Sequence, residues 1–170
     1  MKYSICLPYY DPDYQKVEKF SKLLQSIVKC ASTDDYELVI VKDGPSYVES
    51  HNKAFKNAKG DYLIIFNDDI EVMDNQFLEK FTMDDCISTW KGSAHAWGMS
   101  RRTFEKIGYM DEIFKDGFNC EDTDYFHRAV LAGFPIVDVG VELIHDHNNK
   151  IYGDRSKNID LFIKKWGFKP

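Results

Sequence analysis

The sequence DYLIIFNDD, residues 61–69, joins a short apolar run to two adjacent carboxylates. Residues 62–66 are all apolar or aromatic, a pattern typical of a buried strand. Carboxylates at the end of such a strand repel one another, and burial makes their charged form costly. A divalent cation removes both costs, because hard oxygen ligands bind Mg²⁺ or Mn²⁺. The alternative is a plain polar turn, since Asn and Asp are ordinary turn residues.

Two further strand patterns precede this one. Residues 3–7 and 36–41 are mostly apolar, and residues 17–28 and 48–58 between the strands carry apolar side chains at helical spacing. The resulting β-α-β-α-β order predicts a parallel sheet with right-handed crossovers.

Parallel strands bring their carboxyl ends to one edge of a sheet, which is where ligands bind in open α/β folds. A nucleotide at this edge could stack its base on Tyr9 or Tyr10 and pair a ring N–H with Asp43. A simple turn at Asp43 is the alternative. The residues that we expect at this edge are Pro8, Tyr9, Tyr10, Asp11, Asp43, Asn67, Asp68 and Asp69.

The second half of the chain has a less regular pattern. A strand is predicted at 93–99, an extended segment at 136–144, and helices at 101–107, 122–131 and 161–166. Residues 108–119 are rich in Gly and aromatic side chains and are predicted to form a loop.

The pair Glu121-Asp122 follows this loop at the predicted start of a helix. Acidic side chains in a first helical turn are favoured by the helix dipole, so a structural role is one interpretation. The functional interpretation is a general base that deprotonates an acceptor hydroxyl. Phe118, with other aromatic residues of the loop, could form the floor of a sugar site.

The tripeptide His145-Asp146-His147 ends the extended segment. Residues i and i+2 of a strand project to the same face, so the two imidazoles could reach one metal ion. Alternatively, one could bind the metal while the other orients it, or the pair could be structural.

Composition narrows the class of protein. A chain of 170 residues suits one domain, and its net charge of -6 makes nucleic acid an unexpected partner. Four scattered cysteines favour a reducing compartment, so we expect a cytoplasmic location. We expect no signal peptide at the N-terminus, and no apolar stretch is long enough to form a transmembrane segment.

Taken in order, these segments resemble the inverting family 2 glycosyltransferases of the GT-A fold, including rhamnosyltransferase-like and galactosyltransferase-like members. The resemblance covers nearly the whole chain. It rests on the segments SICLPYYDPDY, YELVIVKDGP, HNKAFKNAKGDYLIIFNDDIEV, GMSRRTFEKIGYMDEIFKDGFNCEDTDYFHRAVLAGF, LIHDHN and NIDLFIKKWG.

The resemblance implies a fold and a division of the chain. The fold would be a single compact α/β domain with a Rossmann-like, mostly parallel central sheet flanked by helices. Residues 1–72 would bind the nucleotide, and residues 73–170 would form the acceptor half with the C-terminal loop and helix.

The resemblance also implies a reaction. A metal-dependent enzyme would move a sugar from a nucleotide-diphosphate sugar, with UDP-sugars favoured, to a glycan, lipid-linked or protein-linked acceptor. Asp122 would be the base and Glu121 would hold an acceptor hydroxyl. Mn²⁺ or Mg²⁺ would be bound by Asp69, His145 and His147. The sugars would contact Trp97, Gly98 and Phe118, and Lys150 or Arg155 could close over the diphosphate.

Two residues depart from the family pattern. Lys42 stands where relatives commonly carry an acidic residue, which leaves two roles open: an altered choice of nucleotide, or a cation for the phosphates. Asn67 replaces the usual first Asp of the metal motif.

Two rival functions remain. A nucleotidyltransferase-like enzyme would also use a metal and a nucleotide, but no Gly-rich Arg/Lys loop follows the first strand. The other rival is a non-catalytic nucleotide- or sugar-binding protein of the same fold.

Overall fold

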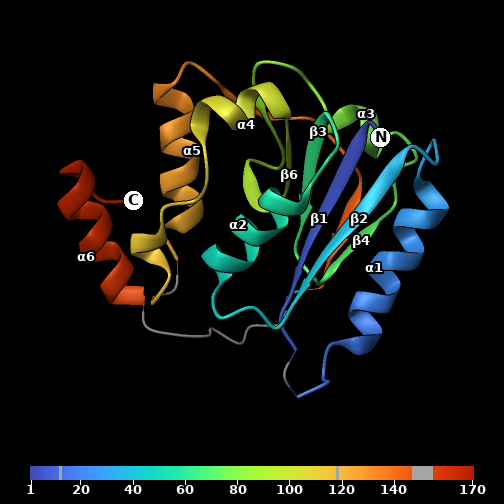
Figure 1. The fold of residues 1–170 in the computed structure, drawn as a ribbon, viewed down its shortest axis with the longest axis horizontal. Coiled ribbons are helices and arrows are strands. Elements are labelled where there is room, and N and C mark those ends of the chain that lie inside the picture. Colours follow the sequence, from blue (N-terminus) through green and yellow to red (C-terminus); the bar gives the residue numbers. More distant parts are fainter. Residues whose placement is uncertain (12, 118, 147–154) are drawn as a thin grey trace.

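The predicted β-α-β-α-β order of the first half is confirmed in the computed structural model of the protein (Figure 1). The structure describes residues 1–11, 13–117, 119–146 and 155–170, so the predicted site residues Phe118, His147 and Lys150 lie outside it. The elements of the first half are β1 (Tyr3–Tyr9), α1 (Val17–Cys30), β2 (Tyr36–Lys42), α2 (Tyr47–Asn57) and β3 (Tyr62–Phe66).

The second half contains more elements than the sequence predicted. Two short strands were not predicted, and the extended segment 136–144 is divided into two strands around Gly140, whose φ is 61°. The elements are β4 (Ile70–Val72), α3 (Phe77–Lys80), β5 (Ile87–Trp90), β6 (Ser93–Ser100), α4 (Arg101–Ile107), the 3₁₀ turn η1 (Glu112–Phe114), α5 (Glu121–Leu131), β7 (Ile136–Asp138), β8 (Leu143–His145) and α6 (Arg155–Trp166).

The central sheet has six strands in the order β2-β1-β3-β6-β5-β7. β1 pairs in parallel with β2 and β3, and β5 pairs in parallel with β7, whereas β6 is antiparallel to both of its neighbours. The sheet is therefore mostly parallel, as predicted. A separate two-stranded sheet joins β4 to β8 and brings the end of β8 next to the end of β3.

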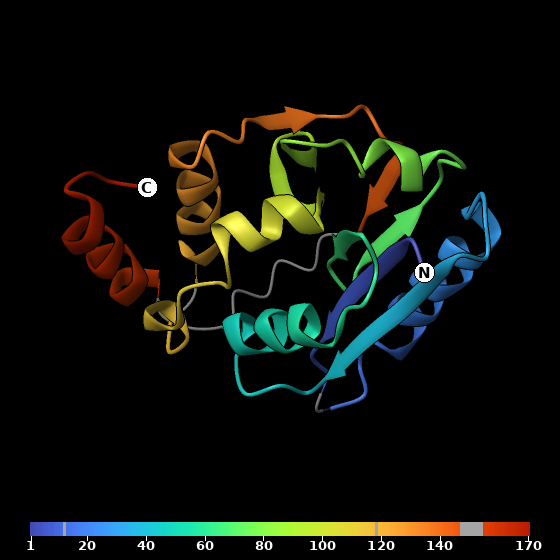
Figure 2. The same cartoon turned by 45° about the horizontal axis from the view of Figure 1, so that its top comes forward.

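The apolar run of β3 is buried on both faces, which explains its continuous hydrophobicity. Leu63 and Ile65 belong to the core under α2, α4 and α5, whereas Ile64 and Phe66 belong to the core under α1. Figures 1 and 2 show α1 on one side of the sheet and α2, α4 and α5 on the other. The helices therefore form two layers that leave the carboxyl ends of β1, β2 and β3 at one edge.

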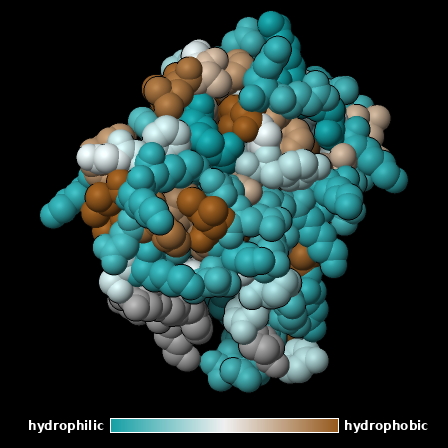
Figure 3. All heavy atoms as spheres, turned by 60° about the vertical axis from the view of Figure 1, so that its left-hand side comes forward, coloured by the Kyte–Doolittle hydropathy of each residue, from teal (hydrophilic) through white to brown (hydrophobic). Residues whose placement is uncertain are grey.

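Helix α6 is joined to α5 through a buried carboxylate. Asp124, fully buried, accepts hydrogen bonds from Lys165 Nζ at 2.6 Å and Trp166 Nε1 at 2.9 Å, and from Arg128 Nε at 2.9 Å. Figure 3 views the side of the molecule that carries α5 and α6, where apolar groups are scattered over a mostly hydrophilic surface. No helix in the described parts of the chain is long and apolar enough to cross a membrane.

Candidate functional site

The three strand ends meet, as the topology predicted, and hydrogen bonds join them. Asp11 N donates to Asp43 Oδ1 at 2.9 Å, and Asp43 N donates to Tyr9 O at 2.8 Å. Tyr10 N donates to Asp68 Oδ2 at 3.4 Å. Pro8 lies just before this junction, paired with β2 at Val41. The ends of β1, β2 and β3 therefore form one continuous polar edge.

The two tyrosines at the end of β1 have different surroundings. The Tyr9 ring stacks on Phe20 with centroids 4.1 Å apart, and its hydroxyl donates to Asp11 Oδ2 at 2.7 Å. Burial and the neighbouring Asp11 carboxylate raise the pKa of Tyr9 well above its ordinary value. Tyr10 is 51% exposed. Of the two rings predicted to support a base, only that of Tyr10 faces the surface.

Asp11 organises the loop that follows β1. Its carboxylate is buried and accepts hydrogen bonds from the backbone N–H groups of Gln15 at 2.7 Å and Lys16 at 2.9 Å, as well as from Tyr9. These bonds lower the pKa of Asp11 although burial opposes the shift. Asp11 thus fixes the conformation of the loop after β1 from its buried side.

Asp68 has a cation partner within the chain. Lys16 Nζ lies 2.9 Å from Asp68 Oδ2 and 3.3 Å from Oδ1, and the side chains are 21% and 12% exposed. Burial raises the pKa of Asp68, and the lysine partly offsets that shift. Lys16 therefore reduces the repulsion between Asp68 and Asp69 that the sequence implies.

Asp69 lies beside the first histidine of the predicted metal set. Its Oδ1 atom is 3.2 Å from His145 Nε2, and it is buried and accepts no hydrogen bond among the described residues. His95 extends the cluster, because its ring lies 4.1 Å from that of His145 and its Nδ1 is 3.1 Å from Asn67 Nδ2.

The donor atoms of this arrangement suit a metal ion. A buried carboxylate oxygen next to an imidazole nitrogen fits a divalent ion such as Mn²⁺, which takes mixed oxygen and nitrogen ligands. No group of three or more His, Cys, Asp or Glu side chains able to hold a metal occurs within the described ranges. The third predicted ligand, His147, lies outside those ranges.

Glu121 and Asp122 begin α5, as predicted, behind a loop with unusual backbone geometry. Asn119 and Cys120 both have left-handed φ values, 76° and 75°. Glu121 is buried, its Oε2 atom has no hydrogen-bond partner among the described residues, and burial followed by the Asp122 charge raises its pKa to about 7. Asp122 is half-buried and accepts from Thr123 N at 2.7 Å.

Tyr47 is the first residue of α2, its ring packs on His51 with centroids 3.9 Å apart, and no hydrogen bond among the described residues involves its hydroxyl. Burial, and then the charges of Asp122, Glu121 and Asp68, raise the pKa of Tyr47 well above its ordinary value.

Three other predicted contacts occupy different places. Trp97 is fully buried and packs against Phe55, Tyr125 and Phe126, so it offers no surface to a sugar. Gly98 allows close packing instead, since a Cβ atom there would lie 2.4 Å from Phe81 O. Both residues are core residues because β6 is an inner strand. Arg155 was predicted in a polar loop but begins α6.

Sequence patterns did not identify Lys16 or His95 as neighbours of the site. Both contact it through partners distant in the chain: 52 positions separate Lys16 from Asp68, and 28 separate Asn67 from His95. The one sequence signal was available for His95, a histidine within an otherwise apolar strand pattern.

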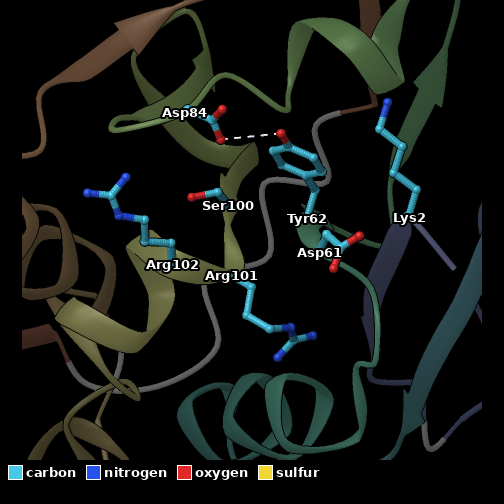
Figure 4. Close-up of a pocket in the computed structure, with 7 residues that line it drawn as sticks. All are labelled: Lys2, Asp61, Tyr62, Asp84, Ser100, Arg101 and Arg102. Atoms are coloured by element: carbon cyan, nitrogen blue, oxygen red, sulfur yellow. Dashed lines mark hydrogen bonds between the residues drawn. The ribbon is translucent and has the colours of Figure 1, made fainter.

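A hollow of about 500 Å³ lies at the opposite edge of the sheet, where β3 begins and β6 ends. Its arginines point in different directions (Figure 4), and the Arg101 guanidinium donates hydrogen bonds to the carbonyl groups of Gly60 and Ala58. Tyr62 Oη donates to Asp84 at 3.2 Å. These groups hold loops together, and they do not converge on a common point.

Comparison with known proteins identifies the fold. No protein-family model matches the chain, and no curated protein matches it in sequence. Among solved structures, TarS of S. aureus in complex with UDP-GlcNAc is similar with a TM-score of 0.72 and 12% identity, over 95% of this chain and 64% of that one. A mutant Drosophila β1,4-galactosyltransferase 7, in complex with manganese, UDP-Gal and xylobiose, has a TM-score of 0.69 and 12% identity, over 92% and 79%.

A third similar structure is the mannosyltransferase PcManGT of Pyrobaculum calidifontis in complex with GDP-Man and Mn²⁺. Its TM-score is 0.56 with 13% identity, over 81% of this chain and 54% of that one. The chain therefore has the GT-A fold of these glycosyltransferases, and its sequence differs widely from theirs.

Proposed function

We propose that the protein transfers a sugar from a nucleoside diphosphate sugar, with UDP-sugars favoured, to an acceptor hydroxyl, and that it inverts the anomeric configuration. The observation that carries this proposal is the polar edge formed by the ends of β1, β2 and β3, where Asp69 Oδ1 lies 3.2 Å from His145 Nε2. Carboxylates at the carboxyl ends of parallel strands suit a divalent cation and a nucleoside diphosphate. Glu121 and Asp122, at the start of α5, would supply the acceptor side.

The donor would be held by residues 1–72. Asp43 accepts a hydrogen bond from a ring N–H of the base, Tyr10 lies against the base, and Asn67 and Asp68 contact the rest of the nucleotide. Asp69 and His145, with His147, would hold a divalent cation, Mn²⁺ or Mg²⁺. When bound, such a cation offsets negative charge on the leaving diphosphate.

The chemical step would be performed at the start of α5. The Asp122 carboxylate takes the proton of the acceptor hydroxyl, whose oxygen attacks the anomeric carbon. A new carbon–oxygen bond forms as the bond to the diphosphate oxygen breaks on the opposite face, which inverts the configuration. Glu121 would hold an acceptor hydroxyl, and the acceptor would be a glycan or a lipid- or protein-linked sugar. A cytoplasmic site of action agrees with the four free, buried thiols.

The similar solved structures support the donor class, since their complexes contain UDP-GlcNAc, UDP-Gal or GDP-Man, two of them with manganese. The test is a screen of nucleotide sugars with Mn²⁺ for donor hydrolysis and for transfer to simple glycosides. We expect turnover with at least one donor, and its loss in Asp69→Ala. Binding without turnover across the panel would instead favour the non-catalytic alternative. Release of pyrophosphate from a nucleoside triphosphate would favour a nucleotidyltransferase.

A further inference from the structure

Three side chains at the end of β2 form a small group on the surface. Lys42 Nζ lies 3.7 Å from Asp43 Oδ2 and 4.7 Å from the centre of the Tyr14 ring. The Lys42 and Asp43 side chains are 47% and 36% exposed, and Tyr14 is 70% exposed. A hydrogen-bond donor, an acceptor and an aromatic face therefore lie within reach of one ligand.

We infer that Lys42 and Tyr14 belong to the nucleobase site and that, with Asp43, they select bases that present a ring N–H beside a carbonyl group. Uracil, thymine and guanine have this pattern. The inference rests on the proposed function, because it assumes that a nucleotide binds at this edge.

The direction of selection follows from the chemistry of the two charged groups. The Asp43 carboxylate can only accept a hydrogen bond, and the Lys42 ammonium group can only donate one. Asp43 Oδ1 already accepts from Asp11 N at 2.9 Å, which fixes the carboxylate and leaves Oδ2 beside the lysine. Uracil N3–H with its neighbouring carbonyl complements this pair, and so does N1–H with O6 of guanine.

Cytosine and adenine are disfavoured at the same position. Their corresponding ring nitrogen carries a lone pair and no hydrogen, so two acceptors would face each other and no hydrogen bond to the carboxylate would form. Sliding the base by one position would restore a match. However, the ribose and diphosphate are bound at the end of β3 in the proposed function, which fixes the position of the base.

The sheet order argues against a phosphate role for Lys42. β2 is the outermost strand of the sheet, and β1 separates it from β3. Neighbouring strands are about 4.8 Å apart, so the end of β2 lies roughly 10 Å from the end of β3. Asp68, at the end of β3, already has Lys16 as its cation. Lys42 is therefore placed on the base side of the nucleotide.

Tyr14 has the features of a binding residue. Its φ of 55° is a strained value for a side chain of this size, and such strain is concentrated at functional sites. The ring buries little surface against the protein, so it contributes little to the stability of the fold. An exposed ring held beneath Lys42 suits stacking with a base, which tolerates any base because each has an aromatic face.

The experiment is calorimetric titration of the full chain, with Mn²⁺ present, using UDP, GDP, CDP, ADP and uridine. We expect the wild type to bind UDP and GDP at least tenfold more tightly than CDP and ADP. Lys42→Met should weaken UDP, GDP and uridine about five- to tenfold and leave CDP and ADP unchanged. Tyr14→Ala should weaken all ligands by a similar factor. Lys29→Met, at the far end of α1, is the matched control and should change nothing.

Three outcomes would overturn the inference. Equal affinity of the wild type for the four diphosphates would exclude selection at this site. An equal loss for all four diphosphates in Lys42→Met, with uridine unaffected, would assign Lys42 to the phosphates. No binding of any nucleotide by the wild type would overturn the proposed function itself, and the inference with it. Both substituted side chains are exposed, so circular dichroism should find each variant folded.

Discussion

At the scale of single residues, two neighbouring carboxyl groups differ in their surroundings. Glu121 is buried with an unpartnered oxygen atom, whereas Asp122 is half-buried and accepts from Thr123 N. Adjacent carboxyl groups in unlike environments can take different roles in one reaction. In the proposed reaction, Asp122 is the group that remains available to an acceptor.

Asp122→Asn should lower the transfer rate about 10²–10⁴-fold, the usual contribution of a general base. Donor affinity should change little, because the base acts on the acceptor only in the transition state. The measurement is transfer kinetics together with calorimetric donor binding. Glu121→Gln is the neighbouring comparison and should mainly raise the KM for the acceptor. Wild-type transfer by Asp122→Asn would leave Asp124 or Asp116 as the next candidates, and of these Asp124 is fully buried and occupied.

Glu121 should make stability depend on pH. Its pKa is raised from 4.5 to about 7 in the folded protein, so the unfolded chain ionises first as the pH rises. Below pH 4.5 the carboxyl is neutral in both states, and the free energy of unfolding is highest. As the pH rises through 7, the unfolded chain has gained the charge more easily than the folded protein, so this part of the free energy of unfolding is lost. A pKa difference of this size corresponds to about 3 kcal/mol in the free energy of unfolding. Urea unfolding should find Glu121→Gln close to wild type at low pH and more stable than wild type above pH 8, by up to that amount.

At the scale of helices and strands, the attachment of α6 gives a sharp prediction. Lys165→Met removes a cation shared by Asp124 and Asp111 and leaves the buried Asp124 less compensated. Loss of one partner of a buried pair is strongly destabilising, and because Lys165 is partly exposed we expect about 2–3 kcal/mol. The matched control is Lys157→Met on the same helix, whose half-exposed pair with Asp116 should contribute about 1 kcal/mol or less. Equal effects of both variants in urea unfolding would contradict a special role for Asp124.

The elements also show what the sequence could predict. The strands and helices of the first half follow from apolar runs and helical spacing, which act within a few residues. β4 and β5 are only three and four residues long, too short to produce such a pattern. The strand ends of the site were predicted from topology. Lys16 and His95 were not, because their contacts depend on how segments distant in the chain pack together. Trp97 was misplaced because an aromatic residue in β6 fits a core as well as a sugar site.

At the scale of the whole molecule, the candidate metal ligands lie where the small sheet leaves the central sheet. Asp69 lies in the connection after β3, directly before β4, and His145 ends β8, where it pairs with Ile70 of β4. A bound ion would therefore stabilise the folded chain, since it binds only where β4 and β8 are paired.

UDP should bind well with Mn²⁺ and poorly with EDTA, and Mn²⁺ alone should raise the melting temperature. Asp69→Ala should remove both effects, and His145→Ala should weaken them, because each removes a donor atom. Calorimetry and thermal unfolding are the measurements. Identical UDP affinity with Mn²⁺ and with EDTA would exclude a metal role. If His147→Ala alone weakens binding, the ligand is the second histidine.

Tyr14, with a left-handed φ of 55°, has counterparts elsewhere in the chain, among them Asp43 with a φ of 47°. These positions differ in whether they can be replaced to improve thermal resistance. Glycine at such positions relieves backbone strain. Asp85 and Lys91 have φ values of 54° and 53° and lie in turns next to β5, so glycine there should be harmless to turnover. Glycine at Tyr14 or Asp43 would relieve similar strain while removing the groups proposed to recognise the base. A directed search for heat-tolerant variants should therefore accumulate substitutions around β5 and leave the end of β2 unchanged.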